Sequence, residues 1–172
     1  MAELAVDATG NDLTYRIIGA AMAVHNAIGP GYPEHVYERA LAAELDQRGI
    51  AYQRQYPFNV YHNDVRVGLF ILDLFVEQTV VVELKALRHL TTDDEVAQVL
   101  TYLKGTGVQV GLLLNFARRR LEYRRIFPSR RDGPERTGRY DRRPPDRRYT
   151  LHGLELDITP ASAYTGRADH SV

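Results

Sequence analysis

Three charged residues interrupt two apolar segments that are otherwise typical of buried β-strands. Residues 72–76 read LDLFV and residues 80–87 read VVVELKAL, so Asp73, Glu83 and Lys85 stand among leucine, valine and phenylalanine. Apolar runs of this kind are typical of strands that are buried on one or both faces. Because a buried, unpaired carboxylate is strongly disfavoured, the positions of these charges require a physical explanation.

A hairpin between the two segments would bring the three charges together. Glu83 and Lys85 are two residues apart and therefore point to the same face of a strand. If the turn takes the three residues 77–79, Asp73 falls directly opposite Glu83, with the two Cβ atoms roughly 5 Å apart. A two-residue turn would instead pair Asp73 with Val82 and remove this geometry.

Two carboxylates at that separation repel each other unless a cation lies between them. Hard divalent cations such as Mg²⁺ take oxygen ligands and are often held by one or two carboxylates together with a substrate phosphate. The spacing therefore fits a metal site at Asp73 and Glu83 with Lys85 beside it, or a solvated sheet face that carries the same charges. Two of the 22 basic residues are lysines, Lys85 and Lys104, so a lysine within an apolar strand favours the metal site.

The composition excludes several other classes of protein. The 172 residues suffice for one domain with a substantial core and an appendage. The chain has no cysteine, which excludes disulfides and thiolate metal sites, and no apolar run near the roughly 20 residues of a membrane span. Its first residues lack the basic start and apolar core of a signal peptide, so we expect a soluble, cytoplasmic protein.

Charge is divided unevenly along the chain, although the formal net charge is zero. Residues 118–172 carry 14 arginines and 8 acidic residues, whereas residues 1–117 carry 8 basic and 14 acidic residues. Thirteen of these arginines, against five acidic residues, fall within residues 118–148. Such a segment suits salt-sensitive contact with a phosphate backbone, or docking on the acidic part of the same chain. We favour contact with nucleic acid.

The hydrophobic periodicity predicts the element order ααβββαββ. Helices are expected at residues 13–28, 33–48 and 92–104, and strands at 52–61, 65–76, 79–86, 108–116 and 121–127. This order predicts an α+β protein (an α/β sandwich) with a mixed central sheet flanked by helices. Pro57 requires the first strand to lie at an edge or to contain a bulge.

The periodicity ends after Pro128. We therefore expect a folded domain at residues 1–128 and an arginine-rich C-terminal tail, disordered or extended, at residues 129–172. Within this tail the sequence TLHGLELDI predicts one short strand.

Several short motifs occur in the order found in a known family. Residues 31–37 read GYPEHVY, a G-x-x-E-x-x-Y motif, which is followed by E-x-A-L and by E-L-x-x-x-G-I ending at Ile50. LDLFV, VVELKAL, QVLTYL at residues 98–103 and GLLLNF at residues 111–116 complete the set. Together these motifs resemble the GxxExxY proteins of the PD-(D/E)XK nuclease superfamily across about residues 13–127.

The resemblance implies a restriction-endonuclease-like core with a divalent metal site. Asp73 and Glu83 would bind Mg²⁺, with Mn²⁺ as a substitute, and Lys85 would be the third catalytic position. Glu34 matches an additional acidic residue of the superfamily, which implies a metal ligand or water-positioning group. Leu72 stands where the superfamily signature has proline, a position that is often degenerate.

The resemblance also assigns a supporting role to Gln98 and Tyr102, which are four residues apart and thus on one helix face. Plainer interpretations exist for several residues. Glu34 would stabilise a helix dipole from the first turn, and Tyr102 would suit core packing. Tyr37 is expected in the core, and His25, His35 and His89 lack the spacing of a zinc site.

We therefore expect a Mg²⁺-dependent nuclease that hydrolyses phosphodiester bonds in DNA. The alternative is a catalytically inactive nucleic-acid-binding or protein-interaction module on the same fold. The oligomeric state stays open, and a homodimer would suit an enzyme that cuts both strands.

Overall fold

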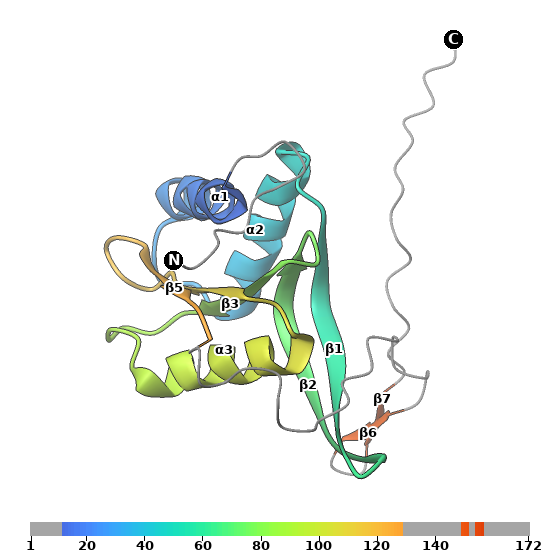
Figure 1. Ribbon diagram of the computed structural model, residues 1–172. Helices are drawn as coiled ribbons and strands as arrows, with labels where there is room; N and C mark the ends of the chain where they lie inside the picture. Colours follow the sequence, from blue (N-terminus) through green and yellow to red (C-terminus); the bar gives the residue numbers. More distant parts are fainter. Residues whose placement is uncertain (1–11, 129–148, 152–153, 157–172) are drawn as a thin grey trace. The chain divides into compact units, whose positions relative to one another are not determined.

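The computed structural model describes residues 12–128, 149–151 and 154–156 (Figure 1). The predicted order ααβββαββ is confirmed, with the elements α1 (Leu13–Ile28), α2 (Glu34–Gln47), β1 (Tyr52–His62), β2 (Val65–Val76), β3 (Val80–Lys85), α3 (Asp93–Thr106), β4 (Val110–Asn115) and β5 (Glu122–Ile126). Among the described helices, none is both long and apolar enough to cross a membrane.

The chain divides into two units, Met1–Arg142 and Arg143–Val172. In the second unit, β6 (Tyr149–Leu151) and β7 (Leu154–Leu156) form an antiparallel hairpin, where one short strand was predicted. The prediction of a disordered or extended tail concerns residues that lie, apart from this hairpin, outside the described ranges.

One mixed sheet organises the first unit. Its strand order is β1-β2-β3-β4-β5, with β3 and β4 parallel and all other neighbouring strands antiparallel. The parallel pair requires a crossover, which α3 supplies. This is the α+β arrangement of a restriction-endonuclease-like core, and β1, which contains Pro57, lies at the edge as predicted.

Helices cover both faces of this sheet (Figure 1). Apolar residues of α1 and α2 form one buried cluster with the even-numbered residues of β3 and β4, such as Val82 and Leu112. Residues of α3 form a second cluster with the odd-numbered ones, such as Val81 and Leu113. The alternation follows from the two-residue period of a strand, so Glu83 and Lys85 belong to the α3 face.

Local sequence signals fix where the helices begin and end. Asp12 caps α1 by accepting a hydrogen bond from the Thr14 backbone N–H at 2.9 Å. Thr92 and Glu95 form a capping box at the start of α3. The Glu95 carboxylate accepts from the Thr92 backbone N–H and hydroxyl, and the Thr92 side chain accepts from the Glu95 backbone N–H. Gly29, with a φ angle of +69°, ends α1 in a conformation that favours glycine.

The β1–β2 hairpin is distorted at Gln55 and Asp73. Beyond this point its side chains alternate between the α3 layer and the α1–α2 layer in the opposite phase. Leu72 belongs to the α3 cluster, whereas Leu74, two residues later, belongs to the α1–α2 cluster. Gln55 has a φ angle of +49°, and the pairing of the two strands omits Gln55 and Asp73 while continuing on both sides of them. This distortion removes Asp73 from the regular ladder at the position where the site forms.

Replacement of Gly105 by alanine is expected to destabilise the protein, although alanine is the better helix former. A Cβ atom at this position of α3 would overlap the ring of Phe58. We expect the free energy of unfolding to fall by about 2 kcal/mol, because overpacking a filled core costs about 1–3 kcal/mol.

Gly19→Ala in α1 is the matched control, since its Cβ would meet only the end of the Arg48 side chain. This variant should be neutral or more stable by up to about 1 kcal/mol. Denaturant unfolding of both variants measures the two changes. Wild-type stability in Gly105→Ala would contradict the close packing of α3 on Phe58.

Candidate active site

The three charges of the β2–β3 hairpin lie together at the carboxyl end of β3. The turn takes the three residues Glu77–Thr79, as the metal-site hypothesis required, and the ladder runs from the pair Val76–Val80 to the pair Leu74–Val82. Asp73 and Glu83 would form the next pair, but the ladder ends before them because β2 is distorted at Asp73. Their side chains are therefore neighbours without being a regular cross-strand pair.

Each of these side chains has a defined hydrogen-bond partner. Lys85 Nζ donates to Glu83 Oε1 at 2.7 Å, and this ion pair is largely buried, with Glu83 3% exposed. The backbone N–H of Leu84 donates to Asp73 Oδ2 at 2.8 Å. The second oxygen of each carboxylate accepts no hydrogen bond from a described residue and remains available as a ligand.

The first turn of α2 brings Glu34 to the same place. Its Oε1 atom accepts a long hydrogen bond, 3.4 Å, from the backbone N–H of Ala86, the residue that follows β3. Glu34 is solvent-exposed, in contrast to Glu83. Its charge acts on Asp73, Glu83 and Lys85, so it forms part of the same electrostatic cluster.

Tyr37 holds the start of α2 in position. Its hydroxyl group donates to the Gly29 carbonyl at 2.8 Å and accepts from the Tyr32 backbone N–H at 3.1 Å. The fully buried ring stacks on Phe116 with a centroid separation of 4.7 Å. Tyr37 is thus a core residue, as predicted, and it fixes the loop that leads into α2, whose first residue is Glu34.

Burial raises the pKa values of both strand carboxyls, and nearby acidic groups add to the increase. The pKa of Glu83 rises to about 7, because burial and the charge of Asp73 outweigh the ion pair with Lys85. Burial also raises the pKa of Asp73, against the effect of the Leu84 hydrogen bond and with a contribution from Glu38. Burial lowers the pKa of Lys85, but the hydrogen bond and charge of Glu83 outweigh it and give a net increase.

The donor set fits a hard divalent cation. When Asp73, Glu83 and Glu34 are ionised, they provide three negative charges against the single ammonium of Lys85, and all their ligand atoms are oxygens. Within the described ranges, no three acidic, histidine or cysteine side chains form a ready-made metal cage. Mg²⁺ does not need one, because it usually keeps several waters and takes one or two carboxylates together with substrate phosphate.

Gln98 and Tyr102 lie beside this cluster on α3. Gln98 Nε2 donates to the Tyr102 hydroxyl at 2.6 Å, which confirms that the two side chains share a helix face. Burial raises the pKa of Tyr102, and the charges of Glu83 and Asp73 add to the effect. Tyr102 also packs edge-on against Phe58, so it belongs both to the core and to the surroundings of the carboxylates.

Glu38 is an acidic group near the site that the sequence did not single out. It is 7% exposed, and its two oxygens accept hydrogen bonds from Arg54 Nε at 2.8 Å and Gln55 Nε2 at 2.9 Å. Gln55 is the residue omitted from the strand pairing together with Asp73. The available signal was the spacing of Glu38, one helical turn after Glu34 on α2.

The three histidines considered above do not contribute to the acidic cluster. His25 is buried, and its Nε2–H donates to the Arg118 carbonyl at 2.8 Å, while His35 and His89 are exposed. His25 is therefore a satisfied core histidine.

The stability of the metal-free protein should depend on pH through Glu83. Its pKa is about 7 in the folded state against 4.5 for the free side chain, so the folded state binds the proton more tightly. The resulting stabilisation is present below about pH 4.5 and is lost as the pH rises through 7. The shift corresponds to about 3 kcal/mol.

Denaturant unfolding of the wild type and of Glu83→Gln between about pH 4.5 and pH 8 measures this term, because glutamine does not titrate. The wild type should lose about 3 kcal/mol more than the variant over this range. Parallel pH profiles for the two proteins would contradict the raised pKa.

Comparison with known proteins places this chain in a family. A family model described as the PD-(D/E)XK nuclease superfamily matches residues 11–126, a range that includes every candidate site residue. No curated protein and no solved structure matches the chain. Nucleases of this superfamily act on nucleic acid and generally use divalent metals. Because the match covers more than half of the sequence, the chain belongs to the PD-(D/E)XK nuclease superfamily.

Proposed function

We propose that this protein is a Mg²⁺-dependent nuclease that hydrolyses phosphodiester bonds in DNA, with Mn²⁺ as a substitute ion. The observation that carries the proposal is the placement of Asp73, Glu83 and Lys85 at the end of β3, where two carboxylates outnumber one ammonium. Membership of the superfamily supports nuclease chemistry. The G-x-x-E-x-x-Y motif at residues 31–37 supports assignment to the GxxExxY proteins within it.

Two carboxylates would hold the metal ion through the oxygens that accept no hydrogen bond from described residues. Asp73 is oriented for this by the Leu84 N–H, and Glu83 by Lys85. The bound ion would polarise the scissile phosphate and lower the pKa of a water molecule. Glu34 reaches the same cluster from α2 and is exposed, so it would act at the solvent side, as an outer ligand or by orienting water.

Lys85 supplies the positive charge on the same strand face. It is half-buried and fixed by its ion pair, and its raised pKa keeps it protonated at neutral pH. A preorganised ammonium in a partly dehydrated site stabilises negative charge that develops on the phosphate oxygens. Gln98 and Tyr102, joined by a hydrogen bond on α3, would support the site by packing beside the carboxylates on the side opposite α2.

The elements that build this site all lie within residues 1–128, which we propose as the nuclease domain. Residues 129–172 would form an arginine-rich appendage to it. Eight of the thirteen arginines of residues 118–148 lie in this appendage, and their charge suits contact with DNA.

Asp73→Ala should abolish Mg²⁺-dependent cleavage and Lys85→Ala should lower its rate strongly, while both variants retain the fold. The first removes a metal ligand, and the second removes transition-state charge stabilisation worth roughly 10²–10³-fold in rate. Cleavage of plasmid and single-stranded DNA by the purified variants, with Mg²⁺, with Mn²⁺ and with neither, measures the effect.

Lys104→Ala is the control, because this exposed lysine lies in the last turn of α3, at the other end of the crossover. It should cleave at the wild-type rate. Circular dichroism checks the folding of each variant. Undiminished cleavage by Asp73→Ala or Lys85→Ala would refute the assignment, and a wild type that binds DNA without cleaving it would support the inactive binding module instead.

A further inference from the structure

Two loops leave the sheet directly beside the candidate active site. β3 and β4 are parallel, and Lys85 pairs with Asn115 at their carboxyl ends. The loop after β3 and the turn between β4 and β5 therefore start side by side, next to the catalytic lysine. The second of these carries three consecutive arginines, Arg118, Arg119 and Arg120, here called the arginine turn.

The two loops are tied together close to the strands. Asn115 is fully buried, accepts a hydrogen bond from the Leu87 backbone N–H at 2.9 Å and donates to the His89 carbonyl at 3.0 Å. The Phe116 N–H donates to the Lys85 carbonyl at 2.9 Å. These bonds make the base of the turn a rigid extension of the site.

Arg118 anchors the turn and is partly neutralised. Its guanidinium group donates to the Arg88 carbonyl at 3.3 Å, and its own carbonyl accepts the hydrogen bond from His25. Burial raises the pKa of Glu122, but hydrogen bonds from Thr91 and Asn115 outweigh this effect and lower the pKa. The charge of Arg118 makes a smaller contribution in the same direction. Arg118 is therefore a structural residue of the turn.

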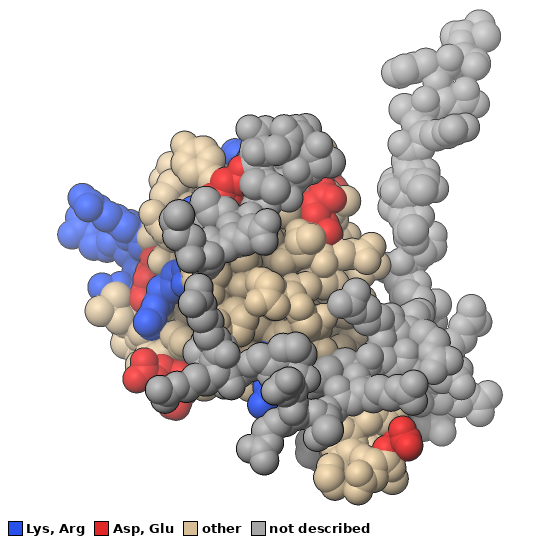
Figure 2. Space-filling model, viewed as in Figure 1, with Lys and Arg blue, Asp and Glu red and all other residues tan. Residues whose placement is uncertain are grey.

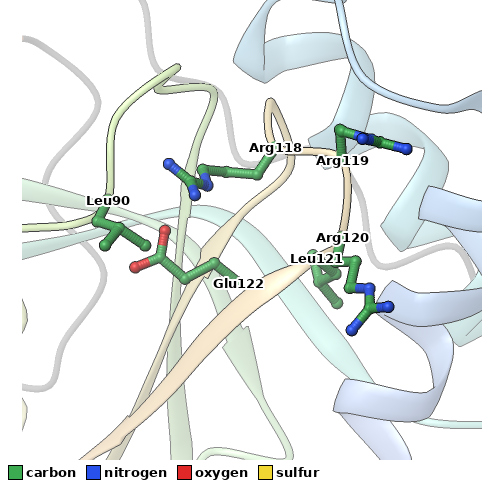
Figure 3. Close-up of a pocket in the computed structure, with 6 residues that line it drawn as sticks. All are labelled: Leu90, Arg118, Arg119, Arg120, Leu121 and Glu122. Atoms are coloured by element: carbon green, nitrogen blue, oxygen red, sulfur yellow. The ribbon is translucent and has the colours of Figure 1, made fainter.

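Arg119 and Arg120 are exposed, and no described residue pairs with their guanidinium groups. In Figure 3, Arg118 extends toward Glu122 and Leu90, whereas Arg119 and Arg120 extend to the other side of the turn. The turn borders a hollow of about 540 Å³ that is lined by Leu90 and residues 118–122. Figure 2 shows basic side chains projecting on the side where the β4–β5 turn lies in Figure 1.

We infer that Arg119 and Arg120 bind backbone phosphates of the DNA strand that occupies the active site. The inference rests on the proposed nuclease function and adds a substrate-binding subsite to it. Guanidinium groups suit this ligand, because their planar fork matches phosphate oxygens and they stay charged. Neither group has an acidic partner in the described structure, and both lie next to a site for one phosphate. This arrangement favours a polymer of phosphates over an isolated anion.

The chain length limits where these contacts fall. Arg119 and Arg120 follow Asn115 by four and five residues, so their backbones lie at most about 18 Å from it. Nucleotides of one duplex strand rise by about 3.4 Å each. The contacted phosphates therefore lie within about five nucleotides of the scissile one, apart from the added reach of the side chains.

Salt dependence of DNA binding tests this subsite. Binding of a short duplex DNA is measured without metal, so that no cleavage occurs, for the wild type, Arg119→Gln/Arg120→Gln and Lys104→Gln. Each lost phosphate contact reduces the slope of log K against log salt by about 0.9. The double variant should thus show a slope less steep by about 1.8, and Lys104→Gln the wild-type slope. An unchanged slope in a folded double variant would overturn the inference.

Neutral-backbone substrates locate the contacts. One uncharged methylphosphonate is placed at successive positions within about five nucleotides of the scissile phosphate. The wild type should lose affinity at one or two positions where the double variant loses little, and equal losses for both proteins would overturn the inference. Cleavage with Mg²⁺ is assayed separately. If the wild type cleaves and the double variant keeps the full salt slope, the subsite alone is refuted. If the wild type never cleaves, the nuclease proposal is refuted.

Discussion

The structure depends on the burial of two carboxylates beside one ammonium at the end of β3. The Glu83–Lys85 ion pair balances one negative charge, and the Leu84 N–H stabilises part of the charge on Asp73. The rest is uncompensated, which is why burial and repulsion raise the pKa of Glu83 to about 7. A core selected for stability alone would place apolar side chains here. A bound dication would turn this unfavourable arrangement into a favourable one.

Three parts of the fold converge on that point. The parallel β3–β4 pair brings the loops that follow both strands to one edge of the sheet. The hydrogen bonds of Tyr37 fix the start of α2, so that Glu34 approaches the end of β3. The distortion of the β1–β2 hairpin frees Asp73 from regular pairing. It also leaves Gln55 out of the strand pairing, and Gln55 donates to the buried Glu38, whose charge acts on the same carboxylate. The rigid sheet thus carries the charges, and loops and helix ends surround them.

Much of this arrangement follows from local sequence signals, and the remainder depends on contacts between distant segments. The period of apolar residues, Gly29 and the Thr92–Glu95 box determine the elements, and the three-residue turn at Glu77–Thr79 determines the hairpin register. The end of the ladder before Asp73 was not predictable, because a positive φ angle at a glutamine has no sequence signature. Glu38 and Asn115 were missed for a related reason. Their roles arise largely from partners 16 to 28 residues away, which periodicity does not reveal.

Proton release on metal binding tests the central claim most directly. Calorimetric titration of Mg²⁺ into the protein at about pH 6.5, in buffers of different ionisation enthalpy, counts the protons released for each ion bound. A Glu83 carboxyl with a pKa of about 7 is largely protonated before the ion binds, so roughly three quarters of a proton should be released. Glu83→Gln should bind Mg²⁺ more weakly and without this release. The wild type could instead fail to bind Mg²⁺, or bind it with no proton released. Either result would contradict the claim that Asp73 and Glu83 form a divalent-metal site in which the pKa of Glu83 is raised.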